Sequence, residues 1–411
     1  MVYVLNKDGK PLMPTERHGK VRRMLRDGQA KVVQRTPFTI QLLYDTTDYI
    51  QEITLGVDPG YEHIGLSATT ETKELYAADI QLRTDIVDNL STRREMRHTR
   101  RNRKTRFRAP RFFNRARGRG WLPPSVRQRI ECHIHVIESV CKILPIFRVV
   151  LEIAAFDIQK IENPDIHGAE YQNGPLKGFE NVREYVLYRD NHTCQCCKGE
   201  NKILQVHHIE SRKVGGDSPG NLITLCKECH EGYHRGEVKL PKNLKREASQ
   251  KAATCMNIMM PTLRKELESR FSNIDYTYGY ITKAVRIAAG LPKEHYIDAR
   301  CISGHPLAKP LGYVFYELKV RCHNRQIHKA TARKGEHGVR RLNQCPREMF
   351  GFRLYDKVLF NKSEYFIWGR RKSGTFKICN LDRTETTERT YKKLKLIERS
   401  KYYLIERKVV G

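Results

Sequence analysis

The sequence contains no long apolar run. No stretch approaches the roughly 20 consecutive apolar residues that a membrane-spanning helix requires, and the opening MVYVLNKDGKPLMPT lacks the pattern of a secretory signal. These absences exclude a membrane-embedded class and predict a soluble, cytoplasmic protein with no membrane partner. The 12 cysteines are therefore expected to be reduced, a state in which metal ligation is more common than disulfide formation.

Acidic residues are scarce relative to basic ones. The chain has 411 residues, with 46 Asp and Glu against 76 Lys and Arg and a formal net charge of +30. A surplus of this size repels itself unless a polyanion neutralises it, and a nucleic-acid backbone is the commonest such partner. The alternative is a solvated basic surface that serves solubility. The length predicts roughly two to four domains.

The segment 91–120, STRREMRHTRRNRKTRFRAPRFFNRARGRG, concentrates this charge, with 13 Arg or Lys and a single acid, Glu95. Because no Gly or Pro follows Ser91 until Pro110, and Ser often begins a helix, we expect a helix here. Cations on every side leave it no apolar face, so it would be stable only against a polyanion. The alternative is a disordered basic arm. The expected nucleic-acid contacts are Arg93, Arg94, Arg97, Arg100, Arg101, Arg103, Lys104, Arg106 and Arg108.

A second basic region lies at the C-terminal end. Residues 301–411 have 26 Lys and Arg against 10 Asp and Glu. The segments RLYDKVLF, EYFIWGRR and TFKICNL alternate apolar and polar residues, and turn-forming NKS and KSG separate them. This pattern predicts a small antiparallel β-domain in which Phe366 and Trp368 belong to the core rather than to a base-stacking surface.

Three acidic patches occur within otherwise apolar elements. ITLGVDPGYEHIGLSAT and FRVVLEIAAFD are typical of strands and contain Asp58 and Glu152, while Pro292 opens an expected helix on which His295 and Asp298 face the same way. Each patch alone has an ordinary explanation: a turn former, an edge-strand residue and a helix cap. Brought together, the carboxylates would repel each other unless divalent cations bridged them. That is the requirement of two-metal phosphodiester cleavage, for which Mg²⁺ is a suitable ion.

Two Cys-x-x-Cys pairs lie close together in the middle of the chain. Cys194 and Cys197 form the first pair, and Cys226 and Cys229 form the second. This spacing is typical of a tetrahedral thiolate site for structural Zn²⁺, which leaves no open position for water. Cys196 could replace Cys197 as the ligand. Four unliganded buried cysteines are the ordinary alternative.

Histidines crowd the same segment. VHHIE, followed by GGDSPGNLITLC and then CH, resembles the His–Asn–His spacing of the HNH nucleases, which fold as a β-hairpin packed on a helix. The resemblance implies that His208 is the general base and that His207 and His230 hold Mg²⁺ or a similar ion against the scissile phosphate. It also implies that Asn221 fixes the loop and the orientation of His208. His234 lies beyond the motif and is interpreted as incidental. A zinc knuckle that binds DNA without cutting is the alternative.

The features follow one another in an informative order: an Asp strand, an Arg-rich helix, a Glu strand, an inserted HNH module, then His-x-x-Asp. This order resembles nucleases whose RuvC-like, RNase H-fold core is interrupted by an HNH domain. Such nucleases are the type II CRISPR effectors and their compact transposon-encoded relatives, the IscB family. Pro11-Leu12-Met13-Pro14 is the signature of the IscB N-terminal domain. The resemblance covers nearly the whole chain and is looser after residue 300.

The implied fold is a multidomain α/β protein with an RNase H-like mixed-sheet core split in three. Its expected parts are a PLMP N-terminal domain (1–53), RuvC-like segment I (54–90), an Arg-rich bridge helix (91–120), RuvC-like segment II (121–165), an HNH domain of the ββα-metal type (166–248), RuvC-like segment III (249–302) and a C-terminal β-rich domain (303–411).

The family implies RNA-guided cleavage of double-stranded DNA by a monomeric protein within a ribonucleoprotein. A structured guide, the ωRNA, would supply the sequence by base pairing. HNH would cut the guide-paired strand, and the RuvC-like site would cut the displaced strand with Mg²⁺ held by Asp58, Glu152 and Asp298. The C-terminal domain would read a motif flanking the target (the TAM). Its Arg370 and Arg371 could contact guanine, although phosphate contact or plain solvation is the more common role.

Two other functions remain open. A guide-independent nuclease, such as a junction resolvase or homing endonuclease, would cut duplex DNA of fixed sequence or structure. A catalytically idle scaffold would bind and protect a transposon transcript. Every expected active-site position is filled in this sequence, which speaks against the scaffold. The sequence therefore favours an endonuclease over a binding protein.

Overall fold

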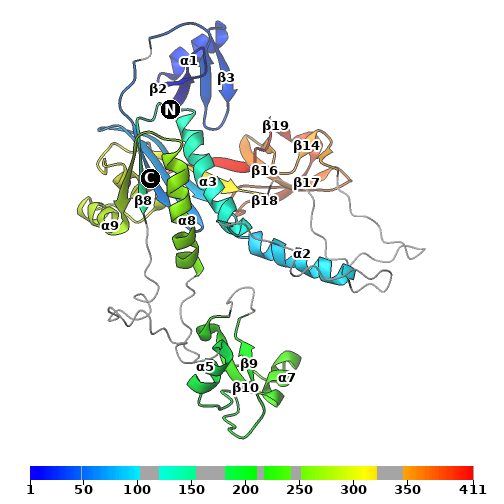
Figure 1. Ribbon diagram of the computed structural model, residues 1–411. Helices are drawn as coiled ribbons and strands as arrows, with labels where there is room; N and C mark the ends of the chain where they lie inside the picture. The colour runs from blue at the N-terminus through cyan, green and yellow to red at the C-terminus, as the bar shows by residue number, and fades with distance from the viewer. Residues whose placement is uncertain are drawn as a thin grey trace. The chain divides into compact units, whose positions relative to one another are not determined.

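A computed structural model describes residues 1–47, 49–101, 120–153, 181–210, 217–241, 251–321 and 346–410. The chain forms two compact units. The first unit combines Met1–Ala154 with Ile258–Gly411, and the second, drawn mainly in green in Figure 1, is the insert Ala155–Asn257. No helix within the described ranges is long and apolar enough to cross a membrane.

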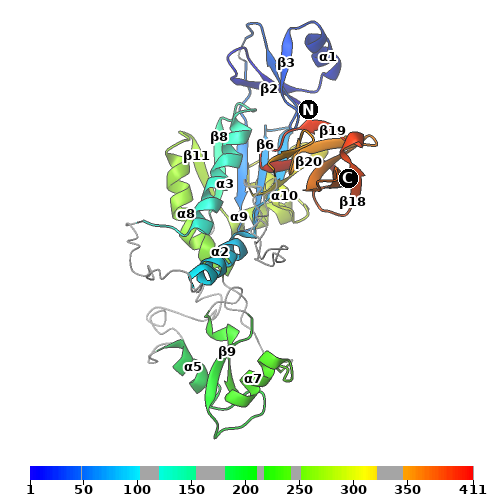
Figure 2. The same ribbon diagram turned by 90° about the vertical axis from the view of Figure 1, so that its right-hand side faces the viewer.

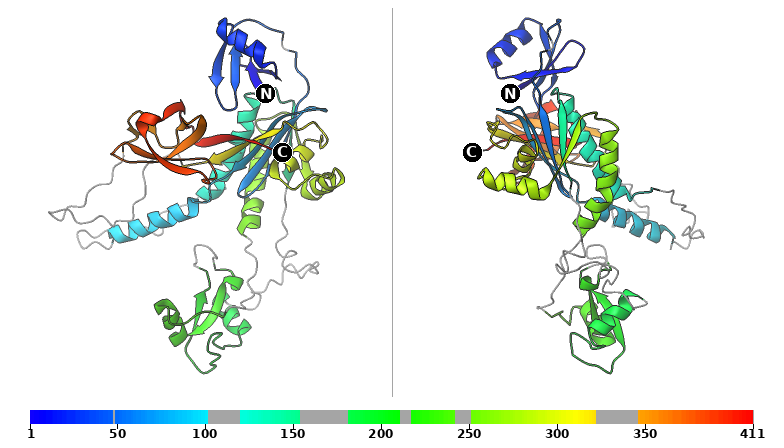
Figure 3. Two further views of the ribbon diagram at one scale, coloured as in Figure 1. Left: turned by 180° about the vertical axis from the view of Figure 1, so that it is seen from behind. Right: turned by 60° about the vertical axis from the view of Figure 1, so that its left-hand side comes forward.

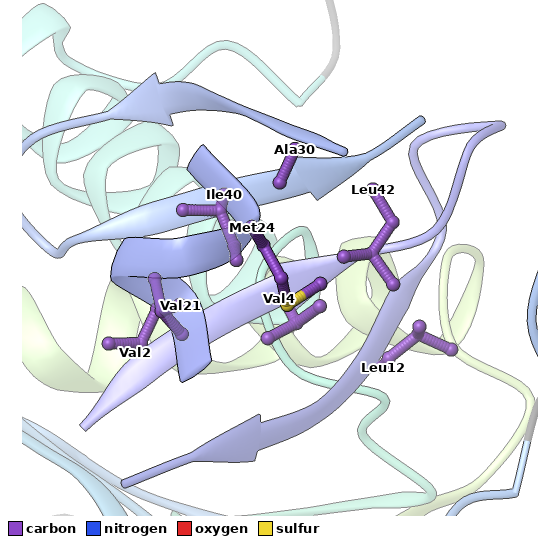
Figure 4. Packing of buried hydrophobic residues seen from close by; sticks show 8 residues of the cluster. All are labelled: Val2, Val4, Leu12, Val21, Met24, Ala30, Ile40 and Leu42. Atoms are coloured by element: carbon purple, nitrogen blue, oxygen red, sulfur yellow. The ribbon is translucent and has the colours of Figure 1, made fainter. Parts of the chain in front are cut away.

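The N-terminal residues form a small sheet covered by one helix. The sheet order is β2-β1-β4-β3, and the elements are β1 (Val2–Leu5), β2 (Pro11–Thr15), α1 (His18–Arg26), β3 (Ala30–Gln34) and β4 (Thr39–Leu42). Figure 4 shows Val21 and Met24 of α1 packed with Val4 of the sheet, and all three are buried. The Pro11-Leu12-Met13-Pro14 signature occupies β2, where Leu12 belongs to the same cluster.

A seven-stranded mixed sheet lies at the centre of the first unit (Figure 2). In spatial order it contains β11 (Ile274–Tyr278), β8 (Arg148–Ile153), β5 (Thr54–Pro59), β6 (His63–Thr69), β7 (Glu74–Gln81), β12 (Tyr313–Lys319) and β20 (Tyr403–Val409). The strands β5, β6 and β7 form an antiparallel meander, whereas β8 and β11 run parallel to β5. The carboxyl ends of β5, β8 and β11 therefore lie at the same end of the sheet. The mixed-sheet α/β class is confirmed.

Helices cover both faces of this sheet (Figure 3). On one face lie α3 (Pro124–Cys141) and α8 (Lys251–Glu268), and on the other lie α9 (Gly279–Ala288) and α10 (His295–Ile302). Apolar residues at helical spacing, including Ile130 and Ile137 of α3 and Met259 and Leu263 of α8, are almost completely buried. The sheet is thus the middle layer of a three-layer arrangement.

The helix α10 lies very close to the sheet. A Cβ added at Gly56 on β5 would overlap the backbone carbonyl oxygen of Ala299, and one added at Gly65 on β6 would overlap that of His295. Real side chains do not tolerate such contacts, so only glycine at these two positions lets the helix approach.

The C-terminal region contains the expected antiparallel sheet, with the order β18-β17-β16-β15-β19. The strands of this sheet are β15 (Lys357–Phe360), β16 (Ser363–Arg370), β17 (Thr375–Cys379), β18 (Thr386–Thr390) and β19 (Lys395–Glu398), with the 3-10 helix η3 (Tyr391–Lys393) before β19. The strands β13 (Glu348–Met349) and β14 (Phe352–Arg353) form a separate two-stranded sheet. Phe366 is buried and Trp368 packs against the same cluster, so their prediction as core residues is confirmed.

The structure differs from the domain boundary expected at residue 303. Both β12 and β20 flank the C-terminal sheet in sequence, yet β12 pairs with β7 and β20 pairs with β12 in the central sheet. The alternation of apolar and polar residues predicts a strand but does not indicate which strand it pairs with, and here the paired strands are far apart in the chain.

The Arg-rich segment begins as the helix α2 (Ile86–Arg101). It starts at Ile86 rather than Ser91, because the carbonyl of Asp85 already accepts a hydrogen bond from the backbone N–H of Asn89, whose side-chain amide also donates to Asp85. The expected nucleic-acid contacts that are exposed on α2 are Arg93, Arg94 and Arg97. The side chains of Arg100 and Arg101, and the whole of Arg103, Lys104, Arg106 and Arg108, lie outside the described residues.

The second unit is a β-hairpin with flanking helices, which is the fold that the HNH resemblance implies. Its elements are α5 (Val182–Arg189), β9 (Leu204–His208), the 3-10 helix η2 (Pro219–Asn221), β10 (Leu222–Cys226) and α7 (Lys227–Arg235). The strands are antiparallel, with His208 opposite Leu222. Arg189 at the end of α5 donates to the carbonyls of Pro219 and Leu222, both at 2.9 Å, and so fixes the start of β10.

Replacing Gly65 tests the dependence of the first unit on the close approach of α10. Gly65→Ala is expected to displace the helix and to lower the melting temperature by several degrees, because the added Cβ meets backbone rather than a flexible side chain. Gly19→Ala is the matched control, since a Cβ there has no atom within 4 Å and alanine favours the helix α1 by up to about 1 kcal/mol. Equal melting temperatures for the two variants, measured by calorimetry, would contradict the close packing.

Candidate active sites and metal centres

Two of the predicted acidic residues lie at the same end of the central sheet. Asp58 is close to the end of β5, and Glu152 is close to the end of its parallel neighbour β8. The next parallel strand, β11, pairs Thr277 with Glu152. Polar groups at the carboxyl ends of parallel strands are the usual place for a site in an α/β sheet.

The helix α10 brings the other two predicted residues to this end. His295 Nδ1 donates to Asp58 Oδ2 at 2.8 Å. Asp298 Oδ1 lies 2.8 Å from Arg286 Nε of α9. Neither of those two atoms has a hydrogen-bond partner among the described residues, so their contact is an ion pair without hydrogen-bond geometry. We call Asp58, Glu152, His295 and Asp298 the carboxylate site.

The pKa values of Glu152 and Asp298 in the carboxylate site are both raised. Burial raises the pKa of Asp298, and the charge of Asp58 adds to this effect, while Arg286 opposes it. Burial also raises the pKa of Glu152; a hydrogen bond from Thr282 opposes this shift, and Asp58 and Asp298 increase it. The carboxylates are therefore close enough to repel each other, which is the electrostatic situation that a divalent cation relieves.

The donor atoms of this site fit Mg²⁺, which prefers carboxylate oxygens. Among the residues described, the groups whose ligand atoms all lie within 4.8 Å of one another consist of cysteines and of histidines, and the three carboxylates are more widely spread. The three carboxylates therefore do not form one tight cluster, and in two-metal phosphodiester cleavage each ion takes only part of the donor set.

A second histidine stacks on His295. The ring centroids of His63 and His295 are 5.2 Å apart and the rings are nearly parallel, at 8°. His63 Nδ1 donates to Asp79 Oδ1 at 3.0 Å. Gly65 pairs with both Asp58 and Asp79 across the meander, which places this second acid–imidazole pair beside the first. The pair was not predicted, because the register of β6 against β7 is not visible in the sequence.

Three imidazoles converge in the second unit. His207 lies on β9, and His230 and His234 lie one turn apart on α7; one nitrogen from each lies within 4.8 Å of the others. Their ring centroids are 5.0, 5.2 and 4.6 Å apart. The interpretation of His234 as incidental is wrong, because residues at i and i+4 share one face of a helix. We call these three residues the histidine site.

The histidine site suits a cation that accepts nitrogen ligands. His207 Nε2 is buried and has no hydrogen-bond partner in the described parts of the chain. Burial lowers the pKa of His207 to about 4, and the imidazoles of His230 and His234 add to this effect. Burial and His234 also lower the pKa of His230. Neutral imidazoles are typical ligands of Zn²⁺ and other transition metals, whereas Mg²⁺ favours oxygen.

The predicted general base, His208, lies next to this group on β9. Its Nε2 lies 2.9 Å from Asp217 Oδ1. Asn221 accepts from the backbone N–H of Glu210 at 2.9 Å and donates to its carbonyl at 3.0 Å, which holds the loop after β9. Asp217 was not predicted, because it lies in a Gly-rich loop where no sequence pattern indicates a functional role for an acid.

The four predicted cysteines form one group. The sulfur atoms of Cys194, Cys197, Cys226 and Cys229 all lie within 4.8 Å of one another, and those of Cys197 and Cys226 are 3.8 Å apart. Cys196 instead donates to a backbone carbonyl 3.7 Å away. The geometry therefore selects Cys197 over Cys196 and has the spacing of a metal site.

These thiols do not all ionise readily by themselves. Burial raises the pKa of Cys226 and of Cys229. At Cys194 burial acts in the same direction, but hydrogen bonds from backbone N–H groups outweigh it and lower the pKa to about 7. A divalent cation would supply the missing positive charge, and four thiolates suit tetrahedral Zn²⁺. Because Cys226 begins α7, such an ion would brace the helix that carries His230 and His234.

Arg370 is engaged within the protein. Its guanidinium donates to three backbone carbonyls in residues 346–352 at 2.8, 2.9 and 3.2 Å. A contact with guanine would compete with these bonds, so the structure favours a structural role for Arg370. Arg371 forms an exposed ion pair with Glu388 at 2.6 Å.

Two protein families match the chain. Residues 2–174 match the family described as RRXRR protein, and residues 194–236 match the family described as HNH endonuclease. Anaredoxin from Nostoc sp. (strain PCC 7120 / SAG 25.82 / UTEX 2576) is 35% identical over 60 residues, which are 14% of this chain and 79% of that protein.

Solved structures of Cas9 from Streptococcus thermophilus are also similar to part of the chain. The complex with the AGGA PAM has 15% identity and a TM-score of 0.31, and the complex with the AGAA PAM has 14% identity and a TM-score of 0.31. Each comparison covers 44% of this chain and 26% of the Cas9 chain, so the protein spans about a quarter of the length of these Cas9 chains. TM-scores at this level do not establish a shared fold.

The HNH match and the hairpin-and-helix unit define the class of this part of the chain, an HNH endonuclease domain. An RRXRR region followed by an HNH domain is the arrangement of IscB/Cas9-type proteins. The two family matches thus confirm the resemblance to IscB/Cas9-like nucleases that was noted in the sequence.

The two neighbouring cysteines allow a matched test of the sulfur group. Cys197→Ser is expected to lose the bound Zn²⁺ and to lower the melting temperature of the second unit, because the metal contributes to folding. Cys196→Ser should keep about one equivalent of Zn²⁺, since its sulfur lies outside the group. Zinc content by mass spectrometry decides the matter, and loss of zinc from Cys196→Ser with retention by Cys197→Ser would reverse the assignment.

Proposed function

We propose that the protein is an RNA-guided endonuclease that cuts both strands of double-stranded DNA, with an ωRNA as its guide. The observation that carries this proposal is the presence of two chemically different candidate sites in two separate units, the carboxylate site in the first and the histidine site in the second. Two sites allow the two strands to be cut independently. The RRXRR and HNH matches, which are the arrangement of IscB/Cas9-type proteins, support the use of a guide.

The carboxylate site would act as the RuvC-like centre on the displaced strand. Asp58, Glu152 and Asp298 would hold Mg²⁺, which supplies charge stabilisation to the attacking and leaving oxygens of a phosphodiester. His295 donates its Nδ1 proton to Asp58, which leaves Nε2 as the atom that exchanges a proton with the substrate.

The histidine site would act on the guide-paired strand. His207, His230 and His234 would hold a divalent cation, which supplies charge stabilisation to the scissile phosphate. Asp217 would accept the Nε2 proton of His208 and so fix the tautomer in which Nδ1 is free. His208 would then take a proton from the attacking water at Nδ1. The cysteine group would hold structural Zn²⁺ beneath α7.

The basic surface would hold the nucleic acids. The helix α2 exposes Arg93, Arg94 and Arg97, and guanidinium groups suit bidentate contacts with phosphate. We assign this helix to the guide RNA, as a bridge helix, and the C-terminal sheet to the motif that flanks the target. With many phosphate contacts in a chain of charge +30, binding should weaken steeply as salt increases.

Single substitutions separate the two proposed active sites. In the purified protein–RNA complex, Asp58→Ala is expected to slow cutting of the displaced strand by roughly 100-fold or more, and His208→Ala to slow cutting of the guide-paired strand by a similar factor. Each variant should leave a nick at the site that the guide specifies. Strand-labelled target DNA resolved on denaturing gels measures both rates in one reaction.

Two outcomes would contradict the proposal. Loss of both cuts in either variant, with DNA binding retained, would show that the sites do not act on separate strands. Undiminished cutting of duplex DNA after removal of the RNA with ribonuclease would identify a guide-independent nuclease instead. Asp45→Ala, which alters an exposed acid of the first unit, is the control expected to cut both strands.

A further inference from the structure

Two tyrosines beside the carboxylate site are largely exposed. Tyr278 ends β11 and is 52% exposed, and Tyr280 lies in the first turn of α9 and is 74% exposed. Their ring centroids are 6.0 Å apart and the rings are nearly parallel, at 16°. Aromatic rings normally stabilise a fold by being buried. A stacked pair that is exposed to solvent contributes little to the stability of the fold, so it is a candidate surface for interaction with a partner.

The place of this pair in the sheet connects it with the proposed chemistry. The strand β11 runs parallel to β8, and Tyr278 pairs with Ile153, the residue after Glu152. Gly279 separates the two tyrosines, and a Cβ there would lie only 3.0 Å from Glu152 Oε1. The two tyrosines therefore lie directly beside Glu152, a carboxylate that would hold metal.

Positive charge accompanies the rings. Lys283 is exposed on α9, three residues after Tyr280 and on the same face of the helix. A cation beside stacked aromatic rings is the combination with which proteins hold single-stranded nucleic acid, since the cation meets the backbone and the rings meet the bases. In a duplex both faces of each base are covered by neighbouring bases, so only an unpaired strand offers a free face.

We propose that Tyr278 and Tyr280 form a stacking platform for unpaired DNA bases and seat the displaced strand on the carboxylate site. This inference rests on the proposed function and adds the surface that would receive a strand once it has left the duplex. Carboxylates would repel the phosphate backbone until cations are bound, so attractive contacts with the bases would help to hold a strand at this position.

A photochemical cross-link tests the platform without requiring cleavage. Full-length protein is mixed with a short DNA single strand that carries one 5-iodouracil, a base that links on irradiation to an aromatic side chain in stacking contact. Mass spectrometry is expected to place the link on Tyr278 or Tyr280. Links found only elsewhere in the chain, or an equal yield at these tyrosines with an RNA strand of the same sequence, would overturn the assignment to DNA.

Paired substitutions test its role in cleavage. The double variant Tyr278→Ala with Tyr280→Ala is expected to cut the displaced strand roughly 10-fold more slowly, equivalent to about 1.4 kcal/mol, and to cut the guide-paired strand at the unchanged rate. The double variant to Phe keeps both rings and should cut both strands normally. Equal slowing of both strands, or the same loss in the Phe variant, would contradict a stacking role. If the unmodified protein cuts no displaced strand, the proposed function fails, and the cross-link alone decides the platform.

Discussion

The arrangement of like charges at one end of the central sheet is the constraint on which the first unit depends. Asp58 and Glu152 come from parallel neighbours, and Asp298 comes from a helix that reaches them because Gly65 has no side chain. Burial and the negative charge of Asp58 raise the pKa of Glu152 and of Asp298. Close packing of the strands and of α10 keeps the three acids at one end of the sheet despite this cost.

The second unit also holds candidate metal ligands close together, but its ligand atoms are nitrogen and sulfur rather than oxygen. Imidazole nitrogens gather on one side of the hairpin and helix, and thiols gather where the helix begins. Because α7 starts at Cys226 and carries His230 and His234, a brace of Zn²⁺ at the thiols would hold the chemically active group in place. The two units therefore differ in donor atoms as well as in fold, and we expect the two candidate sites to prefer different metals.

Residues that interrupt a local pattern were predictable from the sequence. An acid within an apolar strand is costly unless something compensates it, which drew attention to Asp58 and Glu152, and the spacing of the cysteines is itself the signal of a metal site. Asp217 and His63 were missed, because their contacts depend on strand register and loop geometry. The pairing of β12 with β7 was missed for the same reason, since no local pattern names a distant partner.

Diffraction from crystals grown with Mn²⁺ tests the central claim most directly, because Mn²⁺ takes the oxygen ligands of Mg²⁺ and scatters anomalously. The account predicts anomalous difference density between Asp58, Glu152 and Asp298, with Asp298 turned from Arg286 towards the metal. Density for Mn²⁺ elsewhere in the crystal, with none beside Asp58 and with the 2.8 Å contact between Asp298 and Arg286 unchanged, would contradict it.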